Sequence, residues 1–158
     1  MSLVLSLLTG ALLMQGGKPT ATIKLTVPTA AVGQAVKGTL TLVLPEGLHG
    51  YQNPPADEFE NPIKLAVVEK GFRLSKVDYP KGTEMKVAGA DKPTMIYEGK
   101  VEIPFTVVAT KPFPKNSVVN VNFKVEYQLC SMVNCWPPES LIVKAPLKVT
   151  AAPKKAKS

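Results

Sequence analysis

The sequence predicts an all-β protein with the architecture of an immunoglobulin-like antiparallel β-sandwich, on three observations. Apolar and polar residues alternate with a period of two in about seven segments, as in strands with one face in a core. No segment has the apolar spacing of an amphipathic helix. The 15 prolines divide the chain into short pieces bounded by turns. Seven or so short strands separated by turns are typical of this sandwich.

The first half of the chain contains four of the expected strands. Residues 23–27 alternate Ile, Leu and Val with Lys and Thr, and residues 36–44 alternate Val and Leu with Lys and Thr. Residues 63–67 and 72–79 are shorter segments of the same kind. The intervening segment 45–62 is rich in Pro, Gly and charge, so we expect a loop there.

The second half contains three further strands. Residues 97–107 alternate Tyr, Val, Ile and Phe with Glu, Lys and Thr. Residues 118–130 form the longest alternation, with apolar side chains at the odd positions, and residues 141–149 form the last strand. The segment 80–95 has the composition of a second long loop.

The length of 158 residues fits one domain, which can bury a core without needing a disulfide to fold. We expect a signal peptide and linker in residues 1–19, an immunoglobulin-like domain in residues 20–150 and a basic tail in residues 151–158. The apolar run Leu3–Met14 has the length of a signal-peptide core and is too short to span a bilayer. It lacks a preceding Lys or Arg and an A-x-A cleavage site, so a buried strand or helix is the competing interpretation. Export would bring the chain to a compartment where disulfides persist.

The net charge of +7 includes three lysines of the tail, and the remaining charge of 7 − 3 = +4 is spread over many segments. No basic run is interleaved with aromatic residues, so we expect no nucleic-acid partner. No later segment is long and apolar enough to span a membrane. We therefore expect a monomer with no stable membrane span after signal cleavage.

Cys130 and Cys135 are the only cysteines, and four residues separate them. Such a pair can face each other at the mouth of a hairpin with Cα atoms about 5.5 Å apart, within the range of a disulfide. A loop this short removes little entropy from the unfolded chain. Reduction should therefore leave the domain folded and cost well under the roughly 2–5 kcal/mol typical of small disulfide-dependent domains. A purely structural hairpin disulfide in an interaction module remains an alternative.

The phase of the strand gives an expectation about Cys130. Its number is even, in phase with the polar residues Glu126 and Gln128. If the strand stays regular, the Cys130 sulfur points to the polar face and is accessible, although one bulge would reverse this.

We expect no metal or cofactor. A blue-copper site needs two His with a Cys and a zinc site needs four ligands, whereas His49 is the only histidine. We therefore expect His49 to be a polar loop residue without a catalytic role. A Cu(I) site with the three sulfurs of Cys130, Met132 and Cys135 is an alternative function, because Cu(I) accepts soft ligands.

The cysteine segment, "VEYQLCSMVNCWPPES", resembles the active-site hairpin of the N-terminal periplasmic domain of the thiol:disulfide interchange protein DsbD family. The segments "LPEGLHGYQNPP" and "MIYEGKVEIPFTV" are also similar to that family, and the similarity covers roughly residues 20–150. The residues of the cysteine motif are Tyr127, Gln128, Cys130, Cys135, Trp136, Pro137 and Pro138.

The resemblance implies an immunoglobulin-like fold and a periplasmic or otherwise extracytoplasmic disulfide carrier of the thiol:disulfide oxidoreductase type. Its partners would be thioredoxin-like proteins or a membrane electron carrier. The resemblance assigns Cys135 the role of nucleophile and Cys130 that of the resolving cysteine. The supporting residues Tyr127, Trp136, Pro137 and Pro138 would hold the second cysteine on a stiff rim, or serve only turn geometry and packing.

Two features of the sequence depart from the family. The family's membrane-embedded channel and C-terminal thioredoxin-like domain do not occur in it, so we expect another protein to supply the reductant. The stretch that matches the family's shielding cap loop, "TEMKVAGADKPT" at 83–94, has no aromatic residue and no adjacent pair of acids. A cap built from Met85 and Val87 is one possibility that the sequence leaves undecided. No functional residue of the family's cap is carried over to this stretch. The stretch "ADEFE" at 56–60 is expected to be a solvated acidic turn.

Overall fold

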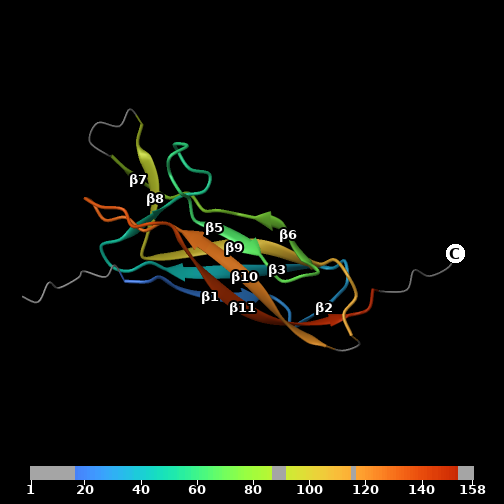
Figure 1. Ribbon diagram of the computed structural model, residues 1–158. Coiled ribbons are helices and arrows are strands. Elements are labelled where there is room, and N and C mark those ends of the chain that lie inside the picture. The colour runs from blue at the N-terminus through green and yellow to red at the C-terminus, as the bar shows by residue number, and fades with distance from the viewer. Residues whose placement is uncertain (1–16, 87–91, 115–116, 153–158) are drawn as a thin grey trace, which may run out of the picture.

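The computed structural model describes residues 17–86, 92–114 and 117–152 (Figure 1). These residues form strands and no helix, and the two larger sheets pack as an immunoglobulin-like sandwich. This confirms the predicted fold class. The apolar run Leu3–Met14 and the tail lysines lie outside the described residues.

The first sheet has the order β1-β3-β9-β6. All its pairs are antiparallel, and the longest pairing joins β3 to β9 from Ala35↔Val108 to Val43↔Lys100. Its strands are β1 (Thr20–Leu25), β3 (Ala35–Val43), β9 (Lys100–Ala109) and β6 (Phe72–Val77).

The second sheet has the order β2-β11-β10-β5. Strands β10 and β11 form a hairpin whose register runs without a shift from Val118↔Lys148 to Tyr127↔Glu139, while the short β2 pairs with β11 in parallel. The strands are β2 (Thr29–Ala31), β11 (Glu139–Thr150), β10 (Val118–Tyr127) and β5 (Lys64–Val67).

The core lies between these two sheets and uses the inward face of each alternation. Phe105 of β9 and Phe123 of β10 meet across it with ring centroids 5.1 Å apart. In β10 the odd residues Val121, Phe123 and Val125 are fully buried, as the sequence pattern predicts. Side chains two residues apart share a face, so the polar positions between them point away from the core.

A third sheet, β4-β8-β7, was not predicted. Strands β4 (His49–Tyr51) and β7 (Thr83–Met85) lie inside the segments expected to be loops, and both pair with β8 (Thr94–Glu98). The loop prediction is wrong at these two places because a strand of three residues is too short to show an alternation.

The predicted strand 97–107 is in fact two strands, since β8 ends at Glu98 and β9 begins at Lys100. Gly99, between them, has φ of +58°, a conformation that glycine adopts at little cost. Its carbonyl accepts a hydrogen bond from the Leu44 amide at 2.8 Å. The turn at Gly99 lets β8 leave the first sheet and join β4 and β7.

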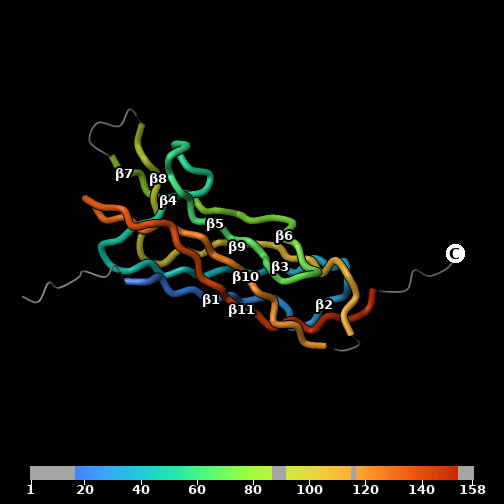
Figure 2. The backbone as a smooth tube through the Cα atoms, in the orientation of Figure 1, coloured from blue at the N-terminus to red at the C-terminus, as the bar shows by residue number. Residues whose placement is uncertain are grey.

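The third sheet and the tip of the β10–β11 hairpin lie at the same end of the molecule (Figure 2). We define the tip as residues 128–138. Among the described residues, no helix has the length and apolar character needed to cross a membrane.

Candidate functional site at the hairpin tip

Cys130 and Cys135 are joined by a disulfide at the tip. Ser131 N–H donates to the carbonyl of Asn134 at 2.7 Å, and Trp136 N–H donates to that of Leu129 at 2.9 Å. These bonds flank the cysteines, which therefore face each other as a non-hydrogen-bonded antiparallel pair. Such pairs are the closer kind, so the Cα atoms are 4.0 Å apart rather than the predicted 5.5 Å.

A tight turn connects the two cysteines and is closed by Ser131. The Ser131 hydroxyl oxygen accepts hydrogen bonds from the amides of Val133 at 3.3 Å and Asn134 at 3.1 Å. Local bonds of this kind stabilise a turn without help from the core. Met132 and Val133 are consequently left 76% and 94% exposed beside the disulfide.

The two sulfur-bearing residues differ sharply in burial. Cys135 is exposed, whereas Cys130 is 1% exposed. The expectation of an accessible Cys130 is therefore wrong. Leu129 packs in the core, so alternation does turn Cys130 to the other side of the strand. At this position side chains of the neighbouring β4 cover that side, since the Tyr51 hydroxyl lies against Cys130 Sγ.

His49 is the residue of β4 that pairs with Cys130. Each of the two amides donates to the other residue's carbonyl at 2.9 Å, and directly opposed side chains project from the same face. His49 is 3% exposed, and burial lowers its pKa from 6.5, against an opposing effect of the Glu98 carboxylate. The expectation of a polar loop residue is thus wrong, since His49 is a buried neighbour of the disulfide.

Tyr51 follows two residues after His49 and so projects from the same face of β4. Its hydroxyl oxygen lies 3.5 Å from Cys130 Sγ and 3.6 Å from Cys135 Sγ. The Tyr51 ring contacts the His49 ring edge to face, with centroids 6.2 Å apart. Burial, together with the negative charge of Glu60, raises the pKa of the Tyr51 phenol above 10.0. Glu60, from the acidic turn expected to be only solvated, therefore acts electrostatically on the site.

Sequence reasoning assigned no role to His49 or Tyr51, yet one signal was available. Gly50 stands between two large side chains in "HGY", within a segment that resembles the family. A Cβ at Gly50 would lie 2.8 Å from Ile63 Cδ1, so only glycine fits without displacement of that side chain. A glycine flanked by two ring side chains is consistent with a strand packed closely on its neighbours.

The disulfide opens into a hollow of about 410 Å³, which we call the disulfide hollow. Its walls are His49 and Tyr51 of β4, Met85 and Lys86 at the end of β7, and residues 130–135 of the tip. Met85 thus lies where the cap was considered, while Val87 is outside the described residues. Lys86 is an exposed cation on the wall of this hollow, and the cysteine motif itself contains none.

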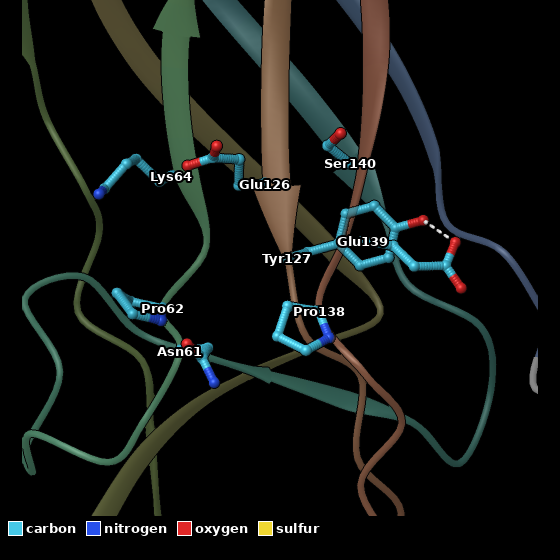
Figure 3. A pocket seen from close by; sticks show the side chains of 8 residues that line it. All are labelled: Asn61, Pro62, Lys64, Glu126, Tyr127, Pro138, Glu139 and Ser140. Carbon is cyan, nitrogen blue, oxygen red and sulfur yellow. Dashed lines mark hydrogen bonds between the residues drawn. The ribbon is translucent and has the colours of Figure 1, made fainter.

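The four supporting residues do not line the disulfide hollow. Tyr127, Trp136 and Pro137 line a smaller depression with Leu48 and Leu129. Pro138 lines a third hollow of about 360 Å³, in which the Tyr127 hydroxyl donates to Glu139 at 3.4 Å (Figure 3). The Trp136 carbonyl accepts a hydrogen bond from the Gln128 side chain at 2.9 Å. These residues hold the base of the tip, away from the sulfurs.

Within residues 17–86, 92–114 and 117–152, no three His, Cys, Asp or Glu side chains come together to hold a metal. The chemistry that the site can perform with its own groups is exchange at the disulfide, because its one reactive bond joins an exposed cysteine to a buried one.

The fold and the site define a class of protein: a β-sandwich with one accessible disulfide at the tip of a hairpin. Comparison of the sequence with models of protein families identifies a family. The model described as the N-terminal domain of the thiol:disulfide interchange protein DsbD matches residues 19–147. The chain belongs to this family, as the resemblance implied.

One solved structure supports the fold. The N-terminal periplasmic domain of ScsB from Proteus mirabilis aligns with a TM-score of 0.55 at 19% identity, covering 78% of this chain and 45% of that chain. The present chain thus spans under half of that structure. The 35 kDa C-terminal fragment of the major pilin GBS80 of Streptococcus agalactiae aligns at a TM-score of 0.46 and 10% identity, over 85% of this chain and 56% of that chain. That score is too low to support any argument. No curated protein matches the sequence.

Proposed function

We propose that this chain passes electrons between thioredoxin-like proteins by thiol-disulfide exchange at Cys130 and Cys135, in the periplasm or another extracytoplasmic compartment. Family membership supports exchange chemistry. The observation that carries the proposal is the unequal exposure of the two cysteines, since Cys135 is an exposed residue and Cys130 is 1% exposed. This difference supports Cys135 as the cysteine that a partner attacks.

In the proposed exchange the exposed cysteine is attacked first. A thiolate of the reduced partner attacks Cys135 Sγ, the S–S bond breaks, and Cys130 leaves with the electron pair. A second partner thiol then attacks the partner's own sulfur in the mixed disulfide and releases Cys135. The partner is oxidised and the pair Cys130/Cys135 is reduced. In the opposite direction Cys135 is the nucleophile and Cys130 resolves the mixed disulfide.

Lys86 supports the role of Cys135 as a nucleophile. An attacking cysteine needs thiolate character, and cations next to a thiol lower its pKa. Lys86 is exposed and lines the disulfide hollow together with Cys135. A membrane electron carrier could serve as the donor by the same chemistry, because the reaction at Cys135 needs only an accessible thiolate.

The test uses each single-cysteine variant with the same thioredoxin. The thioredoxin has its second active-site cysteine replaced and carries an aromatic thiol as a leaving group on the first. Reduced Cys130→Ser should displace the aromatic thiol and form a covalent complex that persists on a non-reducing gel. Reduced Cys135→Ser should form little, because its only thiol is buried.

The wild-type chain supplies the control for resolution. It should form the same complex and then release it, since Cys130 attacks Cys135 Sγ. Equal trapping by both variants would contradict the assigned roles. No reaction by either, together with a reduction potential below about −300 mV, would indicate a structural disulfide instead.

A further inference from the structure

The Tyr51 hydroxyl contacts both atoms of the bond that breaks during exchange, at 3.5 Å from Cys130 Sγ and 3.6 Å from Cys135 Sγ. The sulfurs of a disulfide carry no hydrogen, so the phenol is the donor in both contacts. Among the described residues, no other side chain hydrogen-bonds to either sulfur. A donor on a scissile bond is in a position to affect its cleavage.

The charge that develops in the reaction appears on Cys130. When a thiolate bonds to Cys135 Sγ, the electron pair of the S–S bond remains on Cys130 Sγ. That residue is 1% exposed, so water has little access to the new anion. A buried charge without a hydrogen bond is costly, and a donor aimed at the position where charge develops lowers the barrier.

Several titratable side chains surround Cys130, and their charge states indicate which of them can donate a hydrogen bond to its thiolate. His49 faces it across the backbone pair, with Glu98 opposite His49 on β8, and Lys86 lines the same hollow. Burial lowers the pKa of His49, which is therefore largely uncharged at neutral pH. Burial and Glu60 raise the pKa of Tyr51, so the phenol keeps its proton through neutral and mildly alkaline pH.

We propose that Tyr51 is a catalytic residue whose hydroxyl donates a hydrogen bond to the Cys130 thiolate as this sulfur leaves. The donor keeps its own proton, and the Cys130 thiolate stays hydrogen-bonded to it after the bond to Cys135 has broken, the negative charge having passed from the attacking thiolate to Cys130. In the reverse step the same hydrogen bond stabilises the Cys130 thiolate that attacks the mixed disulfide. This inference rests on the proposed function for the order of attack, in which the incoming thiolate bonds to Cys135.

The test compares the rate at which dithiothreitol reduces the oxidised protein and its variants across a range of pH. Tyr51→Phe removes the hydroxyl and keeps the ring, and should slow reduction by about tenfold to a hundredfold, the range expected for a hydrogen bond to a charged group. The matched control is Tyr97→Phe. It removes the hydroxyl of a buried tyrosine on the adjoining β8, which donates to the Pro80 carbonyl at 2.6 Å and contacts no sulfur. This control should react at the wild-type rate.

A second measurement separates catalysis from a packing effect. In a Cys135→Ala background, the ultraviolet absorbance of the thiolate gives the pKa of the Cys130 thiol. Tyr51→Phe should raise this pKa, and Tyr97→Phe should leave it unchanged. If Tyr51→Phe does not fold, a fluorinated tyrosine at position 51 replaces it. The more acidic phenol should lower the pKa of Cys130.

A Tyr51→Phe rate within twofold of the Tyr97→Phe rate, or an unchanged pKa of Cys130, would overturn the proposal. Dithiothreitol reduces the disulfide without a protein partner. The result of this test can therefore be interpreted even if thioredoxin traps neither single-cysteine variant. Conversely, a negative result here leaves the exchange function standing.

Discussion

The two parts of the β10–β11 hairpin are held together in different ways. Along the ladder from Val118↔Lys148 to Tyr127↔Glu139, each strand pairs with its neighbour in register and buries one face in the sandwich core. At the tip, Cys130 pairs on one side with Cys135 and on the other with His49, from a strand some eighty positions earlier. The ladder depends on the core, whereas the tip depends on one local turn and one distant strand.

Because of this difference, the residues that stabilise the hairpin lie in the ladder, whereas the disulfide lies at the tip. The ladder contains the fully buried residues Val121, Phe123 and Val125, and the hydrophobic effect holds it in place. The tip exposes Met132, Val133 and Cys135 and buries Cys130 against β4. Substitutions in the two parts should therefore have unequal effects on unfolding.

The largest expected effect is in the ladder. Phe123→Ala removes a fully buried ring that packs on Phe105, and should cost about 3–5 kcal/mol of unfolding free energy. Val133→Ala at the tip should stay within about 0.5 kcal/mol of wild type, since Val133 is 94% exposed. Urea unfolding followed by circular dichroism measures both. Equal losses would remove the distinction between ladder and tip.

A smaller effect is expected for the disulfide itself. For so short a loop, the entropy lost by the unfolded chain limits the stabilisation by the disulfide to about 2 kcal/mol of unfolding free energy. The reduced protein should therefore stay folded. The measurement compares denaturant melts of the oxidised protein, the reduced protein and the double Cys130→Ala, Cys135→Ala variant. Non-cooperative unfolding of the double variant would instead make the disulfide a structural requirement.

The smallest effect concerns the pH dependence contributed by His49. Its folded pKa lies below the unfolded value of 6.5, so the folded state binds fewer protons than the unfolded chain in this window. The contribution of neutral, buried His49 to the unfolding free energy is fully present above pH 6.5. It is lost as the pH falls from 6.5 through the lowered pKa of His49 in the folded state. His49→Phe should remove this part of the acid destabilisation, measured as the difference between the two pH–stability curves. Parallel curves below pH 6.5 would show that His49 titrates normally.

The ladder could be predicted from the sequence because its cause is local. Val121, Phe123 and Val125 alternate with polar residues, and each observed side chain lies on the face that this alternation predicts. The sandwich follows from several such segments together with the prolines between them. Residues 36–44 show the same regularity, since β3 buries Val36, Leu40 and Leu42.

The burial of Cys130 could not be predicted in this way, because its cause lies elsewhere in the chain. Its phase correctly turns it from the core, but whether that side meets solvent depends on β4, which has only three residues. The same strand brings His49 and Tyr51 to the disulfide. The roles of Cys135 and Cys130 came from the family resemblance and stay predictions until the trapping experiment is done.

The unequal exposure of the two cysteines has a further consequence for the reduced protein in a compartment rich in small thiols and oxidants. On the proposed roles, a low-molecular-weight disulfide would cap Cys135, and Cys130, its partner in the internal disulfide, would expel the cap. Two copies of the chain would be linked only through Cys135, and the same internal attack would undo that link. We therefore expect the protein to remove such adducts by itself, because each would be converted to the internal disulfide, an ordinary state of the proposed exchange cycle.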